Sequence, residues 1–308
     1  MARILKEEEY PDGILKSRET EYKVQLGGQQ QYRQAYLGQQ DGQQQYRQAY
    51  MYELIVLKES WYPNGQPKYK GYQIDGQPHG LQEAWYENGL PEYKEDYLNG
   101  QQHGVQEAWY ENGQQMYKHN YVNGQLHGLQ ETWYRNGKRA DRGNYVNGQK
   151  HGLQEHWNED GQQTNKENYV NGQKHGLQET WYENGKQEYK GNYVNGQKYG
   201  LREAWHEDGQ QYFKENFVNG QQHGLQEAWY ENGQQEYKEN VVNGQFHGVQ
   251  EYWLDNGQQE YKKYYLDGTQ VSQEAYHAYT QRLGPQIQEA LDLEEPNLLR
   301  IIAEYLLP

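Results

Sequence analysis

The segment His103–Gly124 reads HGVQEAWYENGQQMYKHNYVNG, and its recurrence along the chain decides the fold. Its tryptophan, Trp109, has counterparts at a strict 24-residue spacing that account for every tryptophan of the chain. Fixed spacing of this kind is typical of a repeat protein, in which each unit is one small structural element. The tryptophans are Trp61, Trp85, Trp109, Trp133, Trp157, Trp181, Trp205, Trp229 and Trp253.

Each unit contains two turn sequences, Asn112-Gly113 and Asn123-Gly124 in the quoted segment. Asn-Gly tolerates positive φ and is the strongest short signal for a β-hairpin. Between the turns the side chains alternate with period 2, which is typical of a strand and not of a helix. Nine units over residues 53–268 therefore predict roughly 18 strands. The expected fold class is all-β, an elongated antiparallel β-hairpin repeat ribbon with aromatic rows across its strands.

The composition supports a fold without a large aliphatic core. Leu, Ile, Val and Phe make only 46 of 308 residues and the net charge is −15. Those values alone are typical of a disordered chain. However, 33 Tyr and 9 Trp contradict disorder, because disordered chains are poor in aromatic residues. Burial is expected to use aromatic rings in place of branched aliphatic side chains.

Charge and cysteine content exclude several classes of function. With 29 Lys+Arg against 44 Asp+Glu, nucleic acid is not expected as a partner. The absence of cysteine excludes disulfides and thiol catalysis. No apolar run is long enough for membrane insertion, and residues 1–20 lack the apolar core of a signal peptide. We expect a soluble, cytoplasmic protein.

The N-terminal segment, residues 1–52, contains degenerate copies of the unit. Leu5–Gly13 aligns with Leu57–Gly65, and Gly28–Tyr36 recurs at Gly42–Tyr50. These copies predict two or three imperfect hairpins. The alternative is a flexible leader rich in glutamine.

The C-terminal segment, residues 269–308, has helical periodicity. A first stripe of apolar residues runs from Val271 to Leu283, Gly284-Pro285 is expected to break the helix, and Pro296 opens a further helix. We predict a small helical cap over the last strand. The last stripe also resembles the opening helix of an F-box, which makes it a candidate docking helix. Its residues are Leu298, Leu299, Ile302 and Tyr305.

The Tyr-x-x-x-Tyr strand, the Asn-Gly turn and the following His-Gly pair resemble MORN repeats, and the Trp-Tyr-x-Asn-Gly core is most similar to the MORN repeat variant of YwqK-like proteins. Similar arrays occur in bacteria and in large DNA viruses. The resemblance implies a β-hairpin ribbon used for binding or scaffolding. It also implies two further roles, a structural component of a virion and an antitoxin-like inhibitor.

Seven histidines recur in the His-Gly position, but they do not predict a metal site. Equivalent positions on successive hairpins lie roughly 9.6 Å apart, whereas two nitrogens on one zinc lie within about 4 Å. A turn-stabilising role is expected instead. No metal or other cofactor is predicted.

A glutamate recurs on one strand of the unit and a lysine on the other, as in Glu107 and Lys118. Glycosidase carboxylates form one pair in one cleft, so a repeated row predicts exposed cross-strand ion pairs and not catalysis. The sequence contains no phosphate loop, nucleophile elbow or catalytic triad pattern. The chain is therefore not expected to be an enzyme.

The aromatic rows are the candidate binding surface, because a single-layer sheet leaves ring faces toward solvent or a partner. Similar Trp-Tyr hairpins occur in glycan-binding repeats, which gives a glycan-binding module as an alternative. The candidate residues are Trp85, Trp109, Trp133, Trp181, Trp229, Tyr93, Tyr117, Tyr189 and Tyr237.

One interruption of the aromatic rows is a candidate polar notch. Asp141 and Asn165 replace returning-strand tyrosines, Asn158 replaces the tyrosine after the tryptophan, and His156 replaces a small residue. The alternative is drift in a redundant repeat. Taken together, the sequence predicts a non-catalytic scaffold that binds a protein through an acidic, Tyr- and Trp-lined surface, with self-association left open.

Overall fold

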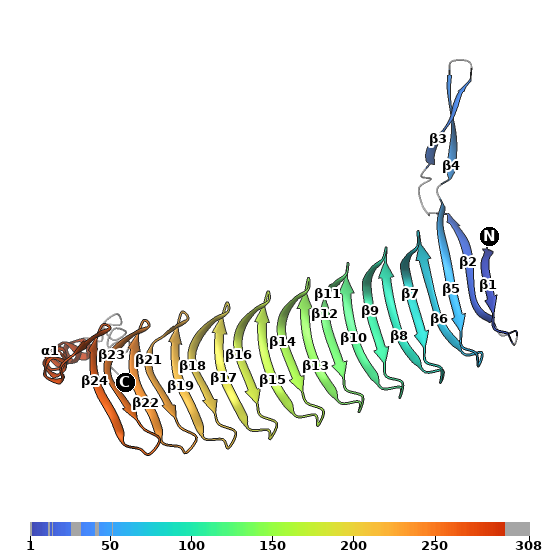
Figure 1. Cartoon of the computed structure of the whole chain (residues 1–308). Helices are drawn as coiled ribbons and strands as arrows, with labels where there is room; N and C mark the ends of the chain where they lie inside the picture. The colour runs from blue at the N-terminus through green and yellow to red at the C-terminus, as the bar shows by residue number, and fades with distance from the viewer. Residues whose placement is uncertain are drawn as a thin grey trace. The chain divides into compact units, whose positions relative to one another are not determined.

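The computed structural model describes residues 2–11, 13, 15–25, 32–40, 43–50 and 52–292. By their contacts these residues divide into two units, Met1–Gln149 and Lys150–Pro308, which are described separately. In each unit the strands that pair with one another run antiparallel (Figure 1). The predicted fold class, an antiparallel β-hairpin repeat ribbon followed by a helix, is confirmed.

Strands β1 to β13 lie wholly within the first unit. They are β1 (Ala2–Glu9), β2 (Leu15–Gln25), β3 (Tyr32–Gln40), β4 (Gln43–Tyr50), β5 (Tyr52–Trp61), β6 (Pro67–Ile74), β7 (Gln77–Trp85), β8 (Pro91–Leu98), β9 (Gln101–Trp109), β10 (Gln115–Val122), β11 (Gln125–Leu126), β12 (Gly128–Trp133) and β13 (Arg139–Val146).

The second unit contains the remaining strands and the helix. They are β14 (Gln149–Trp157), β15 (Gln163–Val170), β16 (Gln173–Trp181), β17 (Gln187–Val194), β18 (Gln197–Trp205), β19 (Gln211–Val218), β20 (Gln221–Gln222), β21 (Gly224–Trp229), β22 (Gln235–Val242), β23 (Gln245–Trp253), β24 (Gln259–Leu266), β25 (Thr269–Val271) and α1 (Gln273–Asp292).

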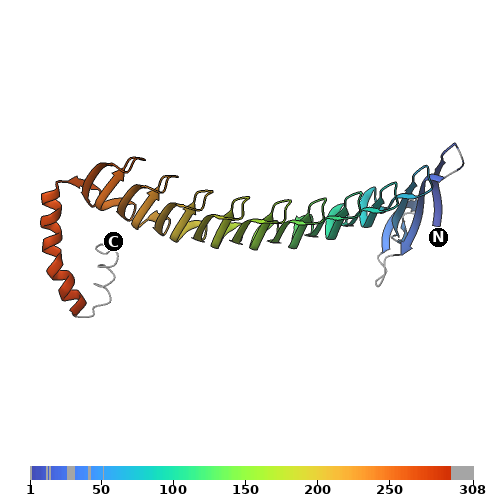
Figure 2. The ribbon, with the colours of Figure 1, turned by 90° about the horizontal axis from the view of Figure 1, so that it is seen from below.

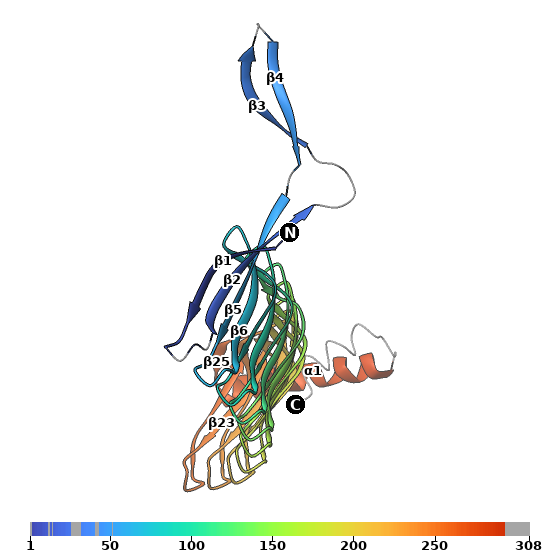
Figure 3. The same cartoon turned by 90° about the vertical axis from the view of Figure 1, so that its right-hand side faces the viewer.

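The first unit opens with two hairpins, β1–β2 and β3–β4. β1 pairs with β2, and β2 pairs directly with β5, from Gln25 opposite Tyr52 to Ser17 opposite Ser60. The repeated segments form β3 and β4, which pair only with each other in a separate two-stranded sheet. Figure 3 shows this hairpin leaving the β1–β2–β5 sheet.

One face of the sheet carries the tryptophans and the other carries the tyrosines. In the β7–β8 pair, Lys94 lies opposite Glu83, and Tyr93 lies opposite Ala84. Because side chains alternate between the faces of a strand, Trp85 shares the face of Glu83. We call the face of Trp85, Glu83 and Lys94, with its equivalents in other repeats, the Trp face, and the face of Tyr93 and Ala84 the Tyr face.

The strands of each unit form a single layer (Figure 2), and burial is concentrated on one side of it. On the Tyr face the small residues and the glutamines between the tyrosines are buried. On the Trp face most side chains are half-buried or exposed. The tyrosine rings therefore cover these buried residues, as the side chains of a hydrophobic core do in a globular protein.

The short turns of the array are two-residue turns with both residues at positive φ. Asn99 and Gly100 have φ of 49° and 78°, which is the conformation that Asn-Gly favours in a hairpin. The Gly100 amide also donates to the Pro78 carbonyl oxygen of the preceding hairpin, at 2.9 Å. Each turn is thus bonded to its neighbour as well as closing its own hairpin.

An irregular β-bulge recurs at His-Gly pairs in both units. Glu95 pairs with Gln106 whereas Tyr97 pairs with Gln102, so one residue of β8 lies opposite three residues of β9. The middle residue of the three is Gly104, whose φ of 78° explains the glycine at this position. The bulge leaves backbone carbonyl groups without ladder partners.

At the bulge some backbone carbonyl groups lack a cross-strand partner, and the side-chain amide of a buried glutamine donates to them instead. Gln106 is 1% exposed, and its Nε2 donates to the carbonyl oxygens of Asp96 (2.8 Å) and His103 (3.3 Å). Gln130 forms both halves of the interaction, since Nε2 donates to the Asn120 oxygen (3.0 Å) and Oε1 accepts from the Asn120 amide (2.9 Å). The same role is played by Gln82, Gln178 and Gln226.

The longer loops are joined from repeat to repeat by side chains. The Tyr86 hydroxyl donates to the Trp109 carbonyl oxygen of the next repeat at 2.7 Å, and Asn88 Nδ2 donates to the Glu111 carbonyl oxygen at 3.0 Å. These contacts give each loop a partner one repeat away. The same bond to a tryptophan carbonyl starts from Tyr62, Tyr110, Tyr182 and Tyr230.

The helix α1 begins after Ser272, whose Oγ accepts from the Ala275 amide at 3.2 Å as an N-cap. The predicted break at Gly284-Pro285 is wrong, because α1 continues to Asp292. Proline removes one amide donor and favours a kink, but the helix is continuous across this position.

α1 packs on the Trp face of the last full hairpin. The Tyr276 ring lies 5.3 Å from the ring of Tyr264, which is paired with Val249 on that face. Tyr279 approaches His247 of β23 at 6.3 Å. α1 therefore contacts β23 and β24, and its role as a cap of the array stays a prediction.

Replacing Gln226 by methionine, which has a similar volume, tests the role of the buried amide. The uncapped carbonyl groups are expected to cost about 1–3 kcal/mol, measured as a lower urea midpoint by circular dichroism. The control is Gln221→Met at an exposed strand position. Equal midpoints for the two variants would contradict this role.

Candidate binding surfaces

The two sets of aromatic candidates lie on opposite faces of the sheet. Trp85 and Trp109 belong to the Trp face, whereas Tyr93 and Tyr117 belong to the Tyr face. The prediction of one surface lined by both residue types is therefore wrong, because adjacent strand positions point to opposite sides. The second unit has the same division, with Trp181 and Trp229 on one face and Tyr189 and Tyr237 on the other. Trp133 follows the rule in β12.

The polar groups of the Tyr face bond to one another. The Glu95 carboxylate accepts from the hydroxyls of Tyr97 (2.8 Å) and Tyr117 (3.0 Å). Glu239, which is 7% exposed, accepts from the Tyr252 hydroxyl at 2.6 Å. These polar groups of the Tyr face therefore already have hydrogen-bond partners on the same face.

The environment of the Tyr face changes the pKa of several groups. Burial raises the pKa of Tyr93 to about 12. Burial, and then the hydrogen bond to Glu95, raises the pKa of Tyr97 to about 12. Burial also raises the pKa of the Glu239 carboxyl. These tyrosines stay protonated at neutral pH and remain hydrogen-bond donors.

In one repeat an arginine replaces the buried glutamine. Arg202 Nη1 lies 2.8 Å from Glu215 Oε2, and Nε donates to the Tyr189 hydroxyl at 3.0 Å. The guanidinium carbon lies 5.3 Å from the ring of Phe213 and 5.2 Å from that of Phe217. A largely buried ion pair among aromatic rings is thus built into the Tyr face of the second unit.

The Trp face carries the predicted ion pairs. Lys94 Nζ lies 3.2 Å from Glu83, and Lys118 Nζ lies 3.0 Å from Glu107. The lysine side chains are 46% and 45% exposed, whereas the glutamates are 19% and 24% exposed. The expected cross-strand charge row is confirmed, and its charges largely neutralise each other.

The Trp face also exposes two rows of aliphatic side chains. Val122 is 42% exposed, and it shares the face of Asn120, which lies opposite Val105. Val105 itself is 39% exposed. Exposed apolar rows are typical of protein interaction surfaces. The exposed members are Leu81, Leu98, Val105, Val122, Val146, Val170, Val194, Leu201 and Val218.

Most of the recurring histidines accept a hydrogen bond from a short turn, whereas Nδ1 of His79 and of His127 is buried without a hydrogen-bond partner. His175 Nδ1 accepts from the Asn195 amide at 3.4 Å, and His103 Nδ1 lies 3.5 Å from the Asn123 amide. The predicted turn-stabilising role is confirmed. Among the described residues, no three His, Cys, Asp or Glu side chains are grouped so as to hold a metal ion.

The residues of the predicted polar notch belong to two units. In the first, Asp141 accepts a 2.8 Å hydrogen bond from Thr132. In the second, His156 and Asn165 are cross-strand partners, and Asn158 lies in the loop after β14. The notch as one recognition site stays a prediction. The docking-helix candidates Leu298, Leu299, Ile302 and Tyr305 lie outside the described residues.

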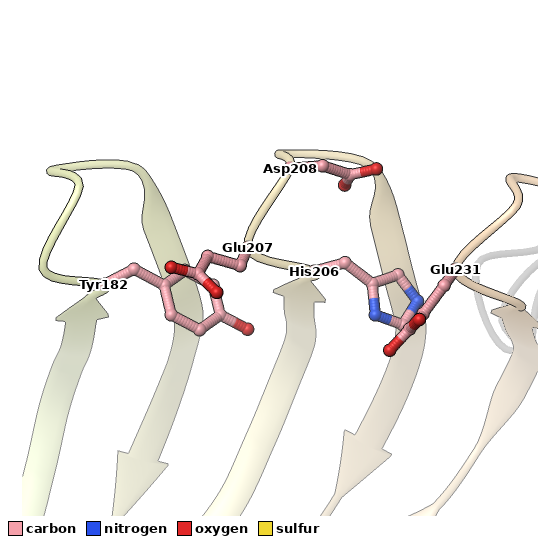
Figure 4. Close-up of a pocket in the computed structure, with 5 residues that line it drawn as sticks. All are labelled: Tyr182, His206, Glu207, Asp208 and Glu231. Atoms are coloured by element: carbon pink, nitrogen blue, oxygen red, sulfur yellow. The ribbon is translucent and has the colours of Figure 1, made fainter.

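A hollow opens on the loop edge of the second unit, where His206 replaces the loop tyrosine. Tyr182, Glu207, Asp208 and Glu231 line the rest of it. Figure 4 shows these five side chains along the loop edge, three of them carboxylates. The hollow is thus acidic.

Sequence reasoning missed the buried glutamine and the loop tyrosine. Both recur every 24 residues, as in Gln82 and Tyr86, so their spacing could have marked them. Glutamine is usually exposed, which hid its role. The replacement by Arg202 was a further visible exception.

The family model described as MORN repeat variant matches residues 102–123, 126–147, 174–195 and 222–243. Each matched segment runs from the residue before a His-Gly bulge to the asparagine of the next short turn. These four segments are MORN repeats of the variant type. The resemblance seen in the sequence is confirmed for these MORN repeats. A search of the curated proteins finds no match. No helix among the described residues is both long and apolar enough to cross a membrane.

The Tyr face should make the repeat array sensitive to alkali. Tyrosines such as Tyr93 and Tyr97 have an ordinary pKa of 10.0 and a folded pKa of about 12. Their contribution to stability is complete below pH 10 and is lost as the pH rises toward 12. We expect tyrosinate absorbance to rise late, together with loss of the circular dichroism signal. A single titration step near pH 10 with the fold intact would contradict this.

Proposed function

We propose that this MORN repeat protein is a non-catalytic scaffold that binds another protein through its Trp face. The observation that carries the proposal is the pair of exposed aliphatic rows on that face. Non-polar surface that stays exposed in a regular array favours a partner. The half-buried tryptophans beside these rows would act as anchors, as tryptophan often does at interfaces.

The two faces differ in the polar groups that they leave available to a partner. On the Tyr face, carboxylates such as Glu95 and Glu239 already accept hydrogen bonds from neighbouring tyrosines. On the Trp face, lysines such as Lys118 extend over their glutamate partners into solvent. The Trp face therefore offers both apolar area and polar groups that fix register.

The chain supplies its own example of docking on this face. Tyr276 of α1 packs against Tyr264 on the Trp face of the last hairpin. An aromatic side chain from a separate element is thus accommodated there. We infer that a partner's apolar side chains bind the Trp face of earlier repeats in a similar way.

Removing part of one aliphatic row tests the proposal. Val170, Val194 and Val218, which are 39%, 42% and 42% exposed, are changed together to serine. We expect a partner captured by the wild-type chain from extracts of its native source to be lost, because apolar contact area is removed. Capture is measured by quantitative mass spectrometry and then by titration with the purified partner.

The control variant carries Leu90→Ser and Leu254→Ser. These residues are similarly exposed, at 39% and 40%, but lie outside the strands. The control should bind like the wild type. Equal binding by all three proteins would contradict the role of the Trp face.

A further inference from the structure

The loops of the second unit are joined to one another by unequal numbers of side-chain hydrogen bonds. Between loops 182–186 and 206–210 two bonds follow the rule. The Tyr182 hydroxyl donates to the Trp205 carbonyl oxygen at 2.7 Å, and Asn184 Nδ2 donates to the Glu207 carbonyl oxygen at 2.9 Å. The loops at 230–234 and 254–258 are joined by the same two bonds.

The junction between loops 206–210 and 230–234 keeps only one of the two side-chain hydrogen bonds. His206 takes the place of the loop tyrosine, and its Nε2 lies 3.1 Å from the Trp229 carbonyl oxygen. Asp208 takes the place of the loop asparagine. A carboxylate has no N–H group, so the bond that Asn184 donates in its own loop has no equivalent from Asp208.

The loop at 158–162 replaces both donors. Asn158 stands at the tyrosine position, and its amide bonds within the loop, with Nδ2 3.1 Å from Gln162 Oε1 and Oδ1 2.9 Å from the Gln162 amide. Its short side chain cannot span the roughly 9.6 Å to the next repeat. Asp160 stands at the asparagine position and, as a carboxylate, cannot donate. Neither of the usual bonds therefore reaches loop 182–186.

The strands below this junction remain paired. Lys166 lies opposite Glu179 and Asn165 opposite Thr180, as the register of the array requires. However, Asn165 also replaces a tyrosine of the Tyr face, so an aromatic ring is missing from the same repeat. Both usual donor side chains and one tyrosine ring are thus replaced in the same repeat, while the backbone ladder is kept.

We propose that the junction between loops 158–162 and 182–186 is a built-in opening point of the second unit. The two loops separate there while β15 and β16 stay hydrogen-bonded. The loop edge of the scaffold can then change its local curvature without unfolding a repeat. This role is independent of which face binds a partner.

Hydrogen exchange of the full chain tests the proposal with two sequence-matched loops. Residues 158–162 read NEDGQ and residues 230–234 read YENGQ. The double variant Asn158→Tyr/Asp160→Asn makes the first loop identical to the second, and Tyr230→Asn/Asn232→Asp does the reverse. Protection of the backbone amides in each loop is measured by mass spectrometry, and circular dichroism checks that each variant is folded.

In the wild type, loop 158–162 is expected to exchange on the order of tenfold faster than loop 230–234, because two hydrogen bonds are missing. The first variant should slow loop 158–162 to the rate of the second loop. The reverse variant should speed up loop 230–234 alone. Equal protection of the two loops in the wild type, or no slowing in a folded first variant, would overturn the proposal.

Discussion

The amide of a buried glutamine replaces the backbone hydrogen bonds that are lost where three residues face one. Without it the His-Gly bulge would leave carbonyl groups such as those of Asp96 and His103 buried and unpaired, which is unfavourable. With it the bulge is stable, and the strand bends and twists at the same place in successive hairpins. The short turn, the histidine that binds it and the start of the next repeat are all positioned by that bulge.

A single-layer sheet with such units has no central core, so each repeat depends on its neighbours. The short turns are joined by backbone bonds and the loops by tyrosine and asparagine side chains, always one repeat away. The Tyr face supplies the buried part of the structure through rings, small residues and carboxylate–hydroxyl pairs. The Trp face is then left with exposed aliphatic rows, and this difference between the faces is the basis of the proposed scaffold role.

Much of the fold could be predicted from spacing alone. The position of Trp109 and the two Asn-Gly turns give the strands, their direction and the repeat length, because turn chemistry is local. The continuity of α1 through Pro285 could not be predicted, since it depends on whether the flanking helical turns are stable enough to offset the hydrogen bond that proline removes. The role of Gln106 could not be predicted either, because it requires the cross-strand register of a bulge and not a residue type.

The candidate surface was only partly predictable. Alternation alone does not relate Trp85 to Tyr93, because they lie on different strands. The pairing of Tyr93 with Ala84, the neighbour of Trp85, places the two aromatic residues on opposite faces. The weak junction at Asn158 was visible as an exception in the sequence. Its meaning depends on the bond between Tyr86 and Trp109, which joins residues 23 apart and is seen only in three dimensions.

The dependence of each repeat on its neighbours is tested most directly by deleting one whole unit, residues 101–124. The deletion joins Gly100 to Gln125 and keeps the 24-residue phase, so the remaining repeats should fold with a β-sheet circular dichroism spectrum and a somewhat lower melting temperature. Deleting only residues 101–112 breaks the phase and should prevent folding of the neighbouring repeats. If both deletions unfold the chain equally, stability comes from long-range packing and the account is wrong.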